Sequence, residues 1–267
     1  MAEIAWLGMY DHPGQHAAND ALWAGIAEDL RLRGVRGVPA RLTRGVGTGE
    51  VWSHPGLLLG MICTRPWALA HDRLRLLGHP VYAGTATPGT HRSRIVVRRD
   101  DPARALADLR GRRVAINDAG SNTGMALLRD RIAPLAGGAP FFAPVIETGA
   151  HARSAEVVAG GRADVAAIDE VTFAALARFA PDVTGALRTL DWSAPAATPA
   201  FVTAATTPPE VVARLRSGLD RVLADPVLAE ARAVLGLTGI VPSRADLRAH
   251  VARQDAAAAA AGYPALA

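Results

Sequence analysis

The sequence has 267 residues, half of them apolar, with 29 basic and 25 acidic residues and a formal net charge of +4. This length is enough for one large or two smaller globular units with their own cores. No apolar run reaches the roughly 18 residues of a membrane-spanning helix. All basic residues are arginines scattered among carboxylates. A nucleic-acid-binding surface would more usually concentrate them in a stripe.

The first third of the chain alternates predicted strands with a predicted helix. Residues 19–33 are predicted to be helical because Leu22, Trp23, Ile26 and Leu30 fall on one helical face. The Gly-rich stretch at 45–49 lacks the spacing and the lysine of a phosphate-binding loop, so we expect a flexible turn there. The predicted strands of this part cover residues 4–9, 41–43, 56–62 and 73–82.

The same alternation continues through the rest of the chain. Predicted strands cover residues 95–98, 114–116, 141–148, 165–168, 187–192 and 201–204. Predicted helices cover residues 106–109, a stretch starting at 124, 152–159, 171–179, 209–223 and 226–235. The alanine run at 256–261 is interpreted as a helix end or a frayed tail. Alternating strands and helices predict an α/β fold with mainly parallel sheets.

Signals for metal, redox or covalent chemistry are weak. Cys63 is the only cysteine, so no disulfide can form within the chain, and its apolar neighbours predict a buried core residue. No Cys/His cluster has metal-ligand spacing, and neither a nucleophile elbow nor a dinucleotide fingerprint is present. The sequence therefore predicts no cofactor, no metal and no enzymatic activity.

The turn Gly-Ser-Asn-Thr-Gly at 120–124 is the most informative motif. It follows the predicted strand at 114–116 and precedes a predicted helix. The first amides of a helix have no partner within it, and the helix dipole adds partial positive charge there, so such a turn can hold an anion. Ordinary helix capping by Ser121 or Asn122 is the alternative.

Further motifs in order along the chain carry a family resemblance. These are residues 91–98 (His-Arg-Ser-Arg-Ile-Val-Val-Arg), the segment 106–124, Thr-Gly-Ala-His at 148–151 and the segment 161–169. Together they resemble the phosphate, phosphite and phosphonate class of ABC-transporter solute-binding proteins. That family has a tyrosine where this sequence has His91, and Thr-Gly-Ser-His where this sequence has Thr-Gly-Ala-His.

The resemblance implies a two-lobed, type 2 periplasmic-binding-protein-like fold, each lobe a mainly parallel sheet flanked by helices. Lobe one would comprise residues 1–92 and 194–267, and lobe two residues 93–193. The ligand would lie in the cleft between the lobes, and hinge closure would trap it.

The resemblance also assigns candidate ligand-binding residues. In the family, the Ser/Thr turn and the histidine of Thr-Gly-Ser-His hold the oxyanion, which here implies Ser121, Asn122, Thr123, Gly124 and His151. Amides, hydroxyls and an imidazole are suitable donors for phosphoryl-type oxygens.

An acidic residue and an opposing set of aromatic and basic residues complete the candidates. Family members that take aminoalkyl phosphonates can meet the ligand's cation with an acidic residue, which here would be Asp169. A helix N-cap is its alternative role. In lobe one, Tyr10, Arg65 and Trp67 follow predicted strands, and His91 lies at the crossover between the lobes. Surface exposure of Arg65 and core packing of Trp67 are the alternatives.

The predicted function is capture of a small oxyanion, a phosphonate or phosphate-like compound, by hinge closure. A permease of an ABC transporter would be the partner if the protein is exported, and a monomer is preferred. However, Met1–Glu3 leads directly into the predicted first strand without an export signal. The sequence as it stands therefore predicts a cytoplasmic protein, and a processed chain would be periplasmic. The alternative function is a cytoplasmic sensor or enzyme of the same fold, acting on a small organic acid or heterocycle.

Overall fold

The computed structural model describes residues 3–70 and 72–266. These form two compact units: unit 1 contains Met1–Thr90 and Ala197–Ala245, and unit 2 contains His91–Ala196 and Asp246–Ala267. Residues 1, 2, 71 and 267, which fall within the predicted lobe bounds, lie outside the described residues. Where the chain passes between the units, β4 (Thr90–His91) and β10 (Ala196–Ala197) form a two-stranded sheet.

Unit 1 is built on a mixed sheet with the strand order β1-β2-β11-β3-β12. β1 runs parallel to β2, whereas β11 is antiparallel to β2 and β3, and β12 is antiparallel to β3. Every residue of β2 is buried, as its continuous apolar run predicts. The strands are β1 (Ile4–Ala5), β2 (Leu57–Ile62), β3 (Leu74–Tyr82), β11 (Ala200–Ala204) and β12 (Leu237–Val241).

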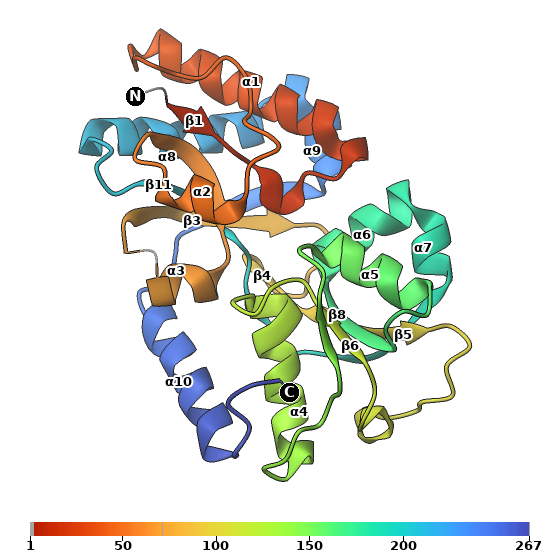
Figure 1. Cartoon of the computed structure of the whole chain (residues 1–267). Coiled ribbons are helices and arrows are strands. Elements are labelled where there is room, and N and C mark those ends of the chain that lie inside the picture. The colour runs from red at the N-terminus through yellow and green to blue at the C-terminus, as the bar shows by residue number, and fades with distance from the viewer. Residues whose placement is uncertain (1–2, 71, 267) are drawn as a thin grey trace. The chain divides into compact units, whose positions relative to one another are not determined.

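Helices cover this sheet with apolar faces. Leu22, Trp23, Ile26 and Leu30 of α1 are all buried, and α1 packs against α8 and α9 (Figure 1). The helical elements of unit 1 are η1 (Gly8–Tyr10), η2 (Pro13–Gln15), α1 (His16–Leu32), α2 (Thr48–Ser53), α3 (Thr64–Ala70), α8 (Pro209–Ala224), η5 (Pro226–Leu228) and α9 (Ala229–Leu235).

Unit 2 has a second mixed sheet with the order β7-β6-β8-β5-β9. β6 is parallel to both β7 and β8, and β5 is antiparallel to both β8 and β9. The strands are β5 (Ser93–Arg98), β6 (Val114–Ile116), β7 (Val145–Glu147), β8 (Val165–Asp169) and β9 (Leu187–Trp192).

The alternation of side chains along the strands gives the unit 2 sheet a core on each face. Ile95 and Val97 of β5 join a cluster with α4, whereas Val96 joins a cluster with α5 and α6 (Figure 1). The helical elements of unit 2 are η3 (Leu106–Leu109), η4 (Asn122–Ala126), α4 (Leu127–Ala136), α5 (His151–Ala159), α6 (Glu170–Phe179), α7 (Pro181–Gly185) and α10 (Leu247–Ala260).

Residues 246–266 belong to unit 2, whereas the sequence analysis placed them in lobe one. α10 packs on α4 (Figure 1), and the buried Arg129 of α4 donates to Asp255 Oδ1 at 2.9 Å and to the Pro264 carbonyl at 3.3 Å. Tyr263 is buried in the same core as α4. The residues that make these contacts lie far apart in the sequence, so no local pattern indicated that they would meet.

Several element predictions are corrected. The sheets are mixed rather than mainly parallel, because β11 and β5 follow the crossings between the units and run opposite to their neighbours. The strand predicted at 4–9 ends at Ala5 and the one at 141–148 covers only Val145–Glu147, after the cis bond Ala143–Pro144. Residues 41–43 are not a strand, and α2 starts within the predicted flexible turn. The α/β fold class itself is confirmed.

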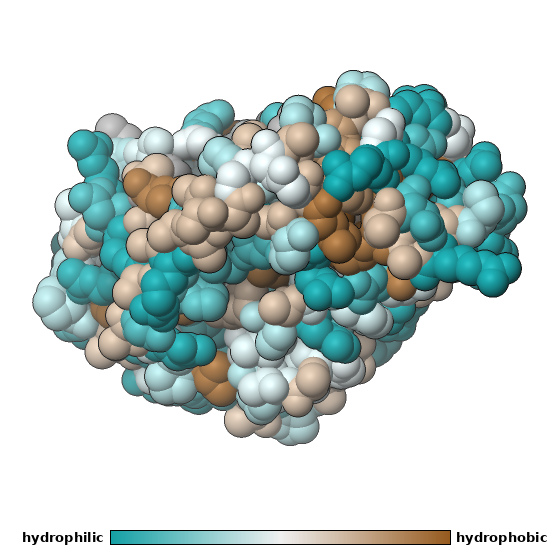
Figure 2. Space-filling model, turned by 90° about the horizontal axis from the view of Figure 1, so that it is seen from below, coloured by the Kyte–Doolittle hydropathy of each residue, from teal (hydrophilic) through white to brown (hydrophobic). Residues whose placement is uncertain are grey.

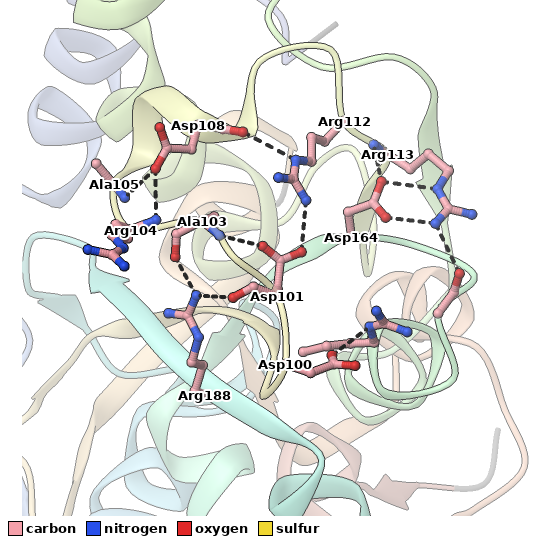
Figure 3. A network of polar contacts seen from close by, with 12 residues as sticks. Asp100, Asp101, Ala103, Arg104, Ala105, Asp108, Arg112, Arg113, Asp164 and Arg188 are labelled. Atoms are coloured by element: carbon pink, nitrogen blue, oxygen red, sulfur yellow. Dashed lines mark hydrogen bonds and ion pairs between the residues drawn. The ribbon is translucent and has the colours of Figure 1, made fainter.

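An arginine–aspartate network fixes the loop between β5 and β6 (Figure 3). Asp101 accepts from Arg112 at 2.8 Å and from the amide of Ala103 at 2.8 Å, and Arg113 pairs with Asp164 at 2.7 Å. Because Arg112 and Arg113 precede β6, the network lies at the edge of the sheet where β6 begins. It therefore supports the sheet without approaching the edge where β6 ends.

Among the described residues, no helix is long and apolar enough to cross a membrane. On the face that Figure 2 shows, strongly hydrophobic residues occur in small groups between hydrophilic ones. Many of the apolar side chains are buried in the cores of the two units.

Truncation of Tyr263 tests the assignment of residues 246–266. Tyr263→Ala is expected to lower the free energy of unfolding by about 3–5 kcal/mol, the usual cost of truncating a buried aromatic side chain. Tyr263→Phe keeps the ring and loses only the hydroxyl bond to the Leu266 carbonyl, so a loss of about 1 kcal/mol is expected. Urea unfolding measures both, and equal stability of Tyr263→Ala and wild type would contradict the packing.

Candidate functional site

Strand directions in unit 2 bring distant segments to one edge of its sheet. β6 and β8 are parallel, so Ile116 and Asp169 end their strands at the same edge. β5 is antiparallel to β8 and begins at that edge, where Ser93 pairs with Asp169. The turns that follow β6, β7 and β8 therefore meet beside the start of β5. Ligands of open α/β sheets bind at such edges.

Helix N-termini face the same edge, because η4 with α4, α5 and α6 each follow one of these strands. Their unpaired first amides and their dipoles give the edge a positive potential. Asp169 caps α6 and Ser121 caps η4, but Ala150 gives α5 no side-chain cap. The first amides of α5 are thus left without a capping oxygen from the residue that precedes the helix.

The turn after β6 is held in one conformation by its own side chains. Ser121 Oγ accepts from the Gly124 amide at 3.0 Å, and the Ser121 carbonyl accepts from the Ala126 amide at 3.1 Å, which makes η4 a π-helical turn. Asn122 and Thr123 are buried in it. π-Helical turns are frequent at functional sites. Ser93 Oγ donates to the Thr123 carbonyl at 2.9 Å and so ties the turn to β5.

Gly124 allows this turn to pack closely against its neighbours. A Cβ at position 124 would lie 1.7 Å from Asn117 Oδ1 and 3.1 Å from His151 Cε1. Asn117 directly follows β6, and sequence reasoning missed it. A polar residue directly after a short buried strand was the available signal.

Thr123 and His151 form the central contact of the edge. Thr123 Oγ1 lies 2.9 Å from His151 Nε2. The His151 residue is half-buried, and its Nδ1 has no contact with solvent. Burial lowers the pKa of His151, and the nearby charge of Asp169 opposes this shift only in part. The ring is therefore neutral at pH 7 and carries a single N–H.

Asp169 is bound on both of its carboxylate oxygens. Oδ1 accepts from the amides of Val171 and Thr172 at 2.8 and 3.0 Å, and Oδ2 lies 2.6 Å from His91 Nδ1. Burial acts to raise the pKa of Asp169, but the charge and hydrogen bond of His91, with smaller contributions from His151 and the Thr172 amide, hold it below its ordinary value. The carboxylate thus takes the N-cap role that the sequence analysis gave as the alternative.

Arginines lie beside this pair on the other face of β5. The guanidinium carbons of Arg92 and Arg94 lie 4.2 and 4.5 Å from the ring centroid of Trp192. Glu170 Oε1 accepts from the Arg92 amide at 2.7 Å. Stacking on an aromatic face is a favourable position for a guanidinium that has few other partners.

The candidates of unit 1 are engaged within that unit. Tyr10 is buried, with its ring edge-to-face against Tyr82 at a centroid distance of 5.1 Å. Trp67 Nε1 donates to the Leu74 carbonyl at 3.0 Å, and Arg65 is half-buried in α3. Arg65 and Trp67, which follow β2, thus lie in the first turns of a helix.

The structure gathers one group of candidates at a single sheet edge and the others in unit 1. Their roles in ligand binding stay predictions. Sequence reasoning missed Ser154, whose hydroxyl lies 2.7 Å from Thr148 Oγ1, and Ser193, whose hydroxyl accepts from the Ser93 amide at 2.8 Å. The partner of Ser193 is 100 residues away in the sequence, so no local pattern indicated that contact. The candidates in unit 2 are His91, Ser121, Asn122, Thr123, Gly124, His151 and Asp169.

Comparison with known families identifies the chain. Residues 59–247 match the family of periplasmic substrate-binding proteins of phosphonate ABC transporters. The chain belongs to this family. The resemblance seen in the sequence is thereby confirmed. Proteins of this family are the solute-binding components of transporters, so the match does not favour the alternative of a sensor or an enzyme. No curated protein matches the sequence.

Solved structures share the fold across nearly the whole chain. PhnD1 of Prochlorococcus marinus with methylphosphonate has a TM-score of 0.75 at 10% identity, covering 96% of this chain and 97% of that one. A binding component of an ABC phosphonate transporter from Pseudomonas aeruginosa has a TM-score of 0.74 at 15% identity, covering 96% and 89%. A Xanthomonas citri protein bound to ATP has a TM-score of 0.72 at 19% identity, covering 97% and 98%. The periplasmic-binding-protein-like fold is confirmed.

A double-mutant cycle tests the close packing at Gly124. Gly124→Ala is expected to cost about 1–2 kcal/mol of unfolding free energy, because the new methyl group displaces the Asn117 side chain. Asn117→Ala removes the clash, so the double variant should be more stable than the sum of the two single changes predicts. Urea unfolding of the four proteins measures this, and strict additivity would contradict the contact.

The lowered pKa of His151 predicts acid sensitivity of the fold. In the unfolded protein the His151 ring takes up a proton near pH 6.5, whereas in the folded protein burial opposes this. The free energy of unfolding therefore falls as the pH is lowered below about 6.5. Between pH 7 and about 5.5, the free energy of unfolding should fall less steeply for His151→Gln than for wild type. Identical slopes would show that the ring is not held neutral.

Proposed function

We propose that this protein captures a small phosphonate- or phosphate-like anion at the edge of unit 2 where β6 and β8 end. The observation that carries the proposal is the contact of 2.9 Å between Thr123 Oγ1 and His151 Nε2, set among helix N-termini. Membership of a phosphonate-binding family and a neighbour holding methylphosphonate support the class of ligand.

Each group in the turn has a part in this proposal. The first amides of η4 and α5 point positive dipoles at the anion. Ser121 Oγ accepts from the Gly124 amide, and its own hydrogen stays available to donate. The bond between Thr123 and His151 orients the hydroxyl and the ring together, so that the site need not reorganise when the anion arrives. Asn122 is buried in the same turn, and the Nδ2 group of its amide is the donor that it would offer to an anion.

The proposal includes the place of the protein in transport. The family delivers its solute to the permease of an ABC transporter, and the protein would act as the binding component without catalysis. The family is periplasmic, which supports export of the working protein. Ligand contacts by Tyr10, Arg65 and Trp67 and hinge closure of the two units, which the resemblance implies, stay predictions.

Ligand binding is tested by calorimetry and thermal shift with phosphate, phosphite, methylphosphonate, ATP, a sulfonate and a small carboxylate. The expected result is selective binding of methylphosphonate or a related anion, and a ligand at 100 times its Kd should stabilise the fold by about 2.7 kcal/mol. ATP is included because a structural neighbour holds it.

Thr123 provides a matched pair of variants for the same measurement. Thr123→Val keeps the shape but loses the hydroxyl, so affinity should fall about tenfold or more, the value of one charge-assisted hydrogen bond. Thr123→Ser restores the hydroxyl and should retain most of the affinity. Binding of none of the anions by the folded protein would refute the proposed function, and binding of ATP alone would replace the phosphonate with a nucleotide.

A further inference from the structure

We infer that the captured anion carries no ammonium group, so that the site selects alkyl phosphonates, phosphonate-like or phosphate-like anions over aminoalkyl phosphonates. This inference rests on the proposed function and concerns the specificity of the same site. The observation behind it is that the acidic side chains at the candidate edge are already bound by groups of the protein itself.

Asp169 is the carboxylate best placed to receive a cation, and it is fully engaged. Its side chain is 2% exposed, Oδ1 accepts two amides at the start of α6, and Oδ2 is 2.6 Å from His91 Nδ1. A ligand ammonium would have to displace His91, which is itself 1% exposed, and leave the imidazole buried without its partner. A buried polar group that loses its hydrogen-bond partner costs free energy, so this exchange is unfavourable.

The next carboxylate is engaged as well. Glu170 Oε1 accepts from the Arg92 amide at 2.7 Å, and its charge faces the guanidinium of Arg94. The guanidinium groups of Arg92 and Arg94 both stack on Trp192. Two arginines beside one glutamate leave this region with an excess of positive charge, which attracts an anion and repels an ammonium group.

Other acidic residues near the candidates do not offer a buried receptor for a cation. At this edge, Asp118 is exposed and accepts from the Gly120 amide at 2.6 Å, and Glu147 is exposed at the end of β7. In unit 1, Asp11 beside Tyr10 accepts from Arg44 at 2.6 Å and from Asn19 at 2.9 Å. Exposed carboxylates discriminate weakly because water screens their charge.

Calorimetry with isosteric ligand pairs tests the inference. Ethylphosphonate is compared with aminomethylphosphonate, and propylphosphonate with 2-aminoethylphosphonate, because in each pair a methyl group replaces the ammonium. The wild-type protein is expected to bind the alkyl member at least tenfold more tightly. Equal or tighter binding of the amino member overturns the inference but leaves the proposed function standing. If the protein binds no phosphonate, phosphite or phosphate, both the proposed function and the inference are refuted.

Variants at the buried pair identify its part in this preference. His91→Phe frees Asp169 Oδ2, so the ratio of affinities should move at least tenfold toward the amino ligand. His91→Phe with Asp169→Asn should reverse the move, because the asparagine Oδ1 still caps α6 but the charge is gone. If the folded His91→Phe protein keeps the wild-type ratio of affinities for the alkyl and amino ligands, Asp169 is not the discriminating group. If this variant does not fold, the comparison of the ligand pairs on the wild-type protein decides the inference.

Discussion

The antiparallel pairing of β5 with β8 is the constraint on which the candidate site depends. It sets Ser93 opposite Asp169, at the edge where β6 and β8 both end. From that register follow the bond of Ser93 Oγ to the Thr123 carbonyl and the approach of His91 to Asp169. A slip of this pairing by one residue would place the side chains of Ser93 and Asp169 on opposite faces of the sheet. The local turn geometry alone would not bring these groups together.

Asp169, at the edge where β8 ends, is a buried carboxylate with a structural role. Asp169 ends a strand, caps the following helix and binds a histidine from another strand, so a single carboxylate joins β8, α6 and β4. Such a group tolerates burial because each oxygen has partners. The Thr123 hydroxyl and the His151 ring, in contrast, contact each other rather than a charged group. Groups that are not fully used by the fold are the ones that can serve a ligand.

Local sequence patterns predicted the elements and the turn well, for physical reasons. Continuous apolar runs such as Leu57–Ile62 and residues 165–168 are buried on both faces of their sheets. Glycine followed by serine after a short strand formed the capped turn at Ser121. Strand direction could not be predicted in the same way, because it depends on where the chain returns from the other unit. Two further contacts could not be predicted, because no periodic pattern in the sequence relates the residues that make them. These contacts are Asn117 with Gly124 and His91 with Asp169.

The return of residues 246–266 to unit 2 affects the order in which the protein can be completed. The ribosome delivers the chain from its N-terminus, so β11, α8 and β12 of unit 1 emerge before Tyr263 and the partner of Arg129. Unit 1 can close its sheet during synthesis, while the core of unit 2 around α4 lacks one wall until its last segment arrives. The wall that Tyr263 adds to the unit 2 core is thus synthesised after every element of unit 1.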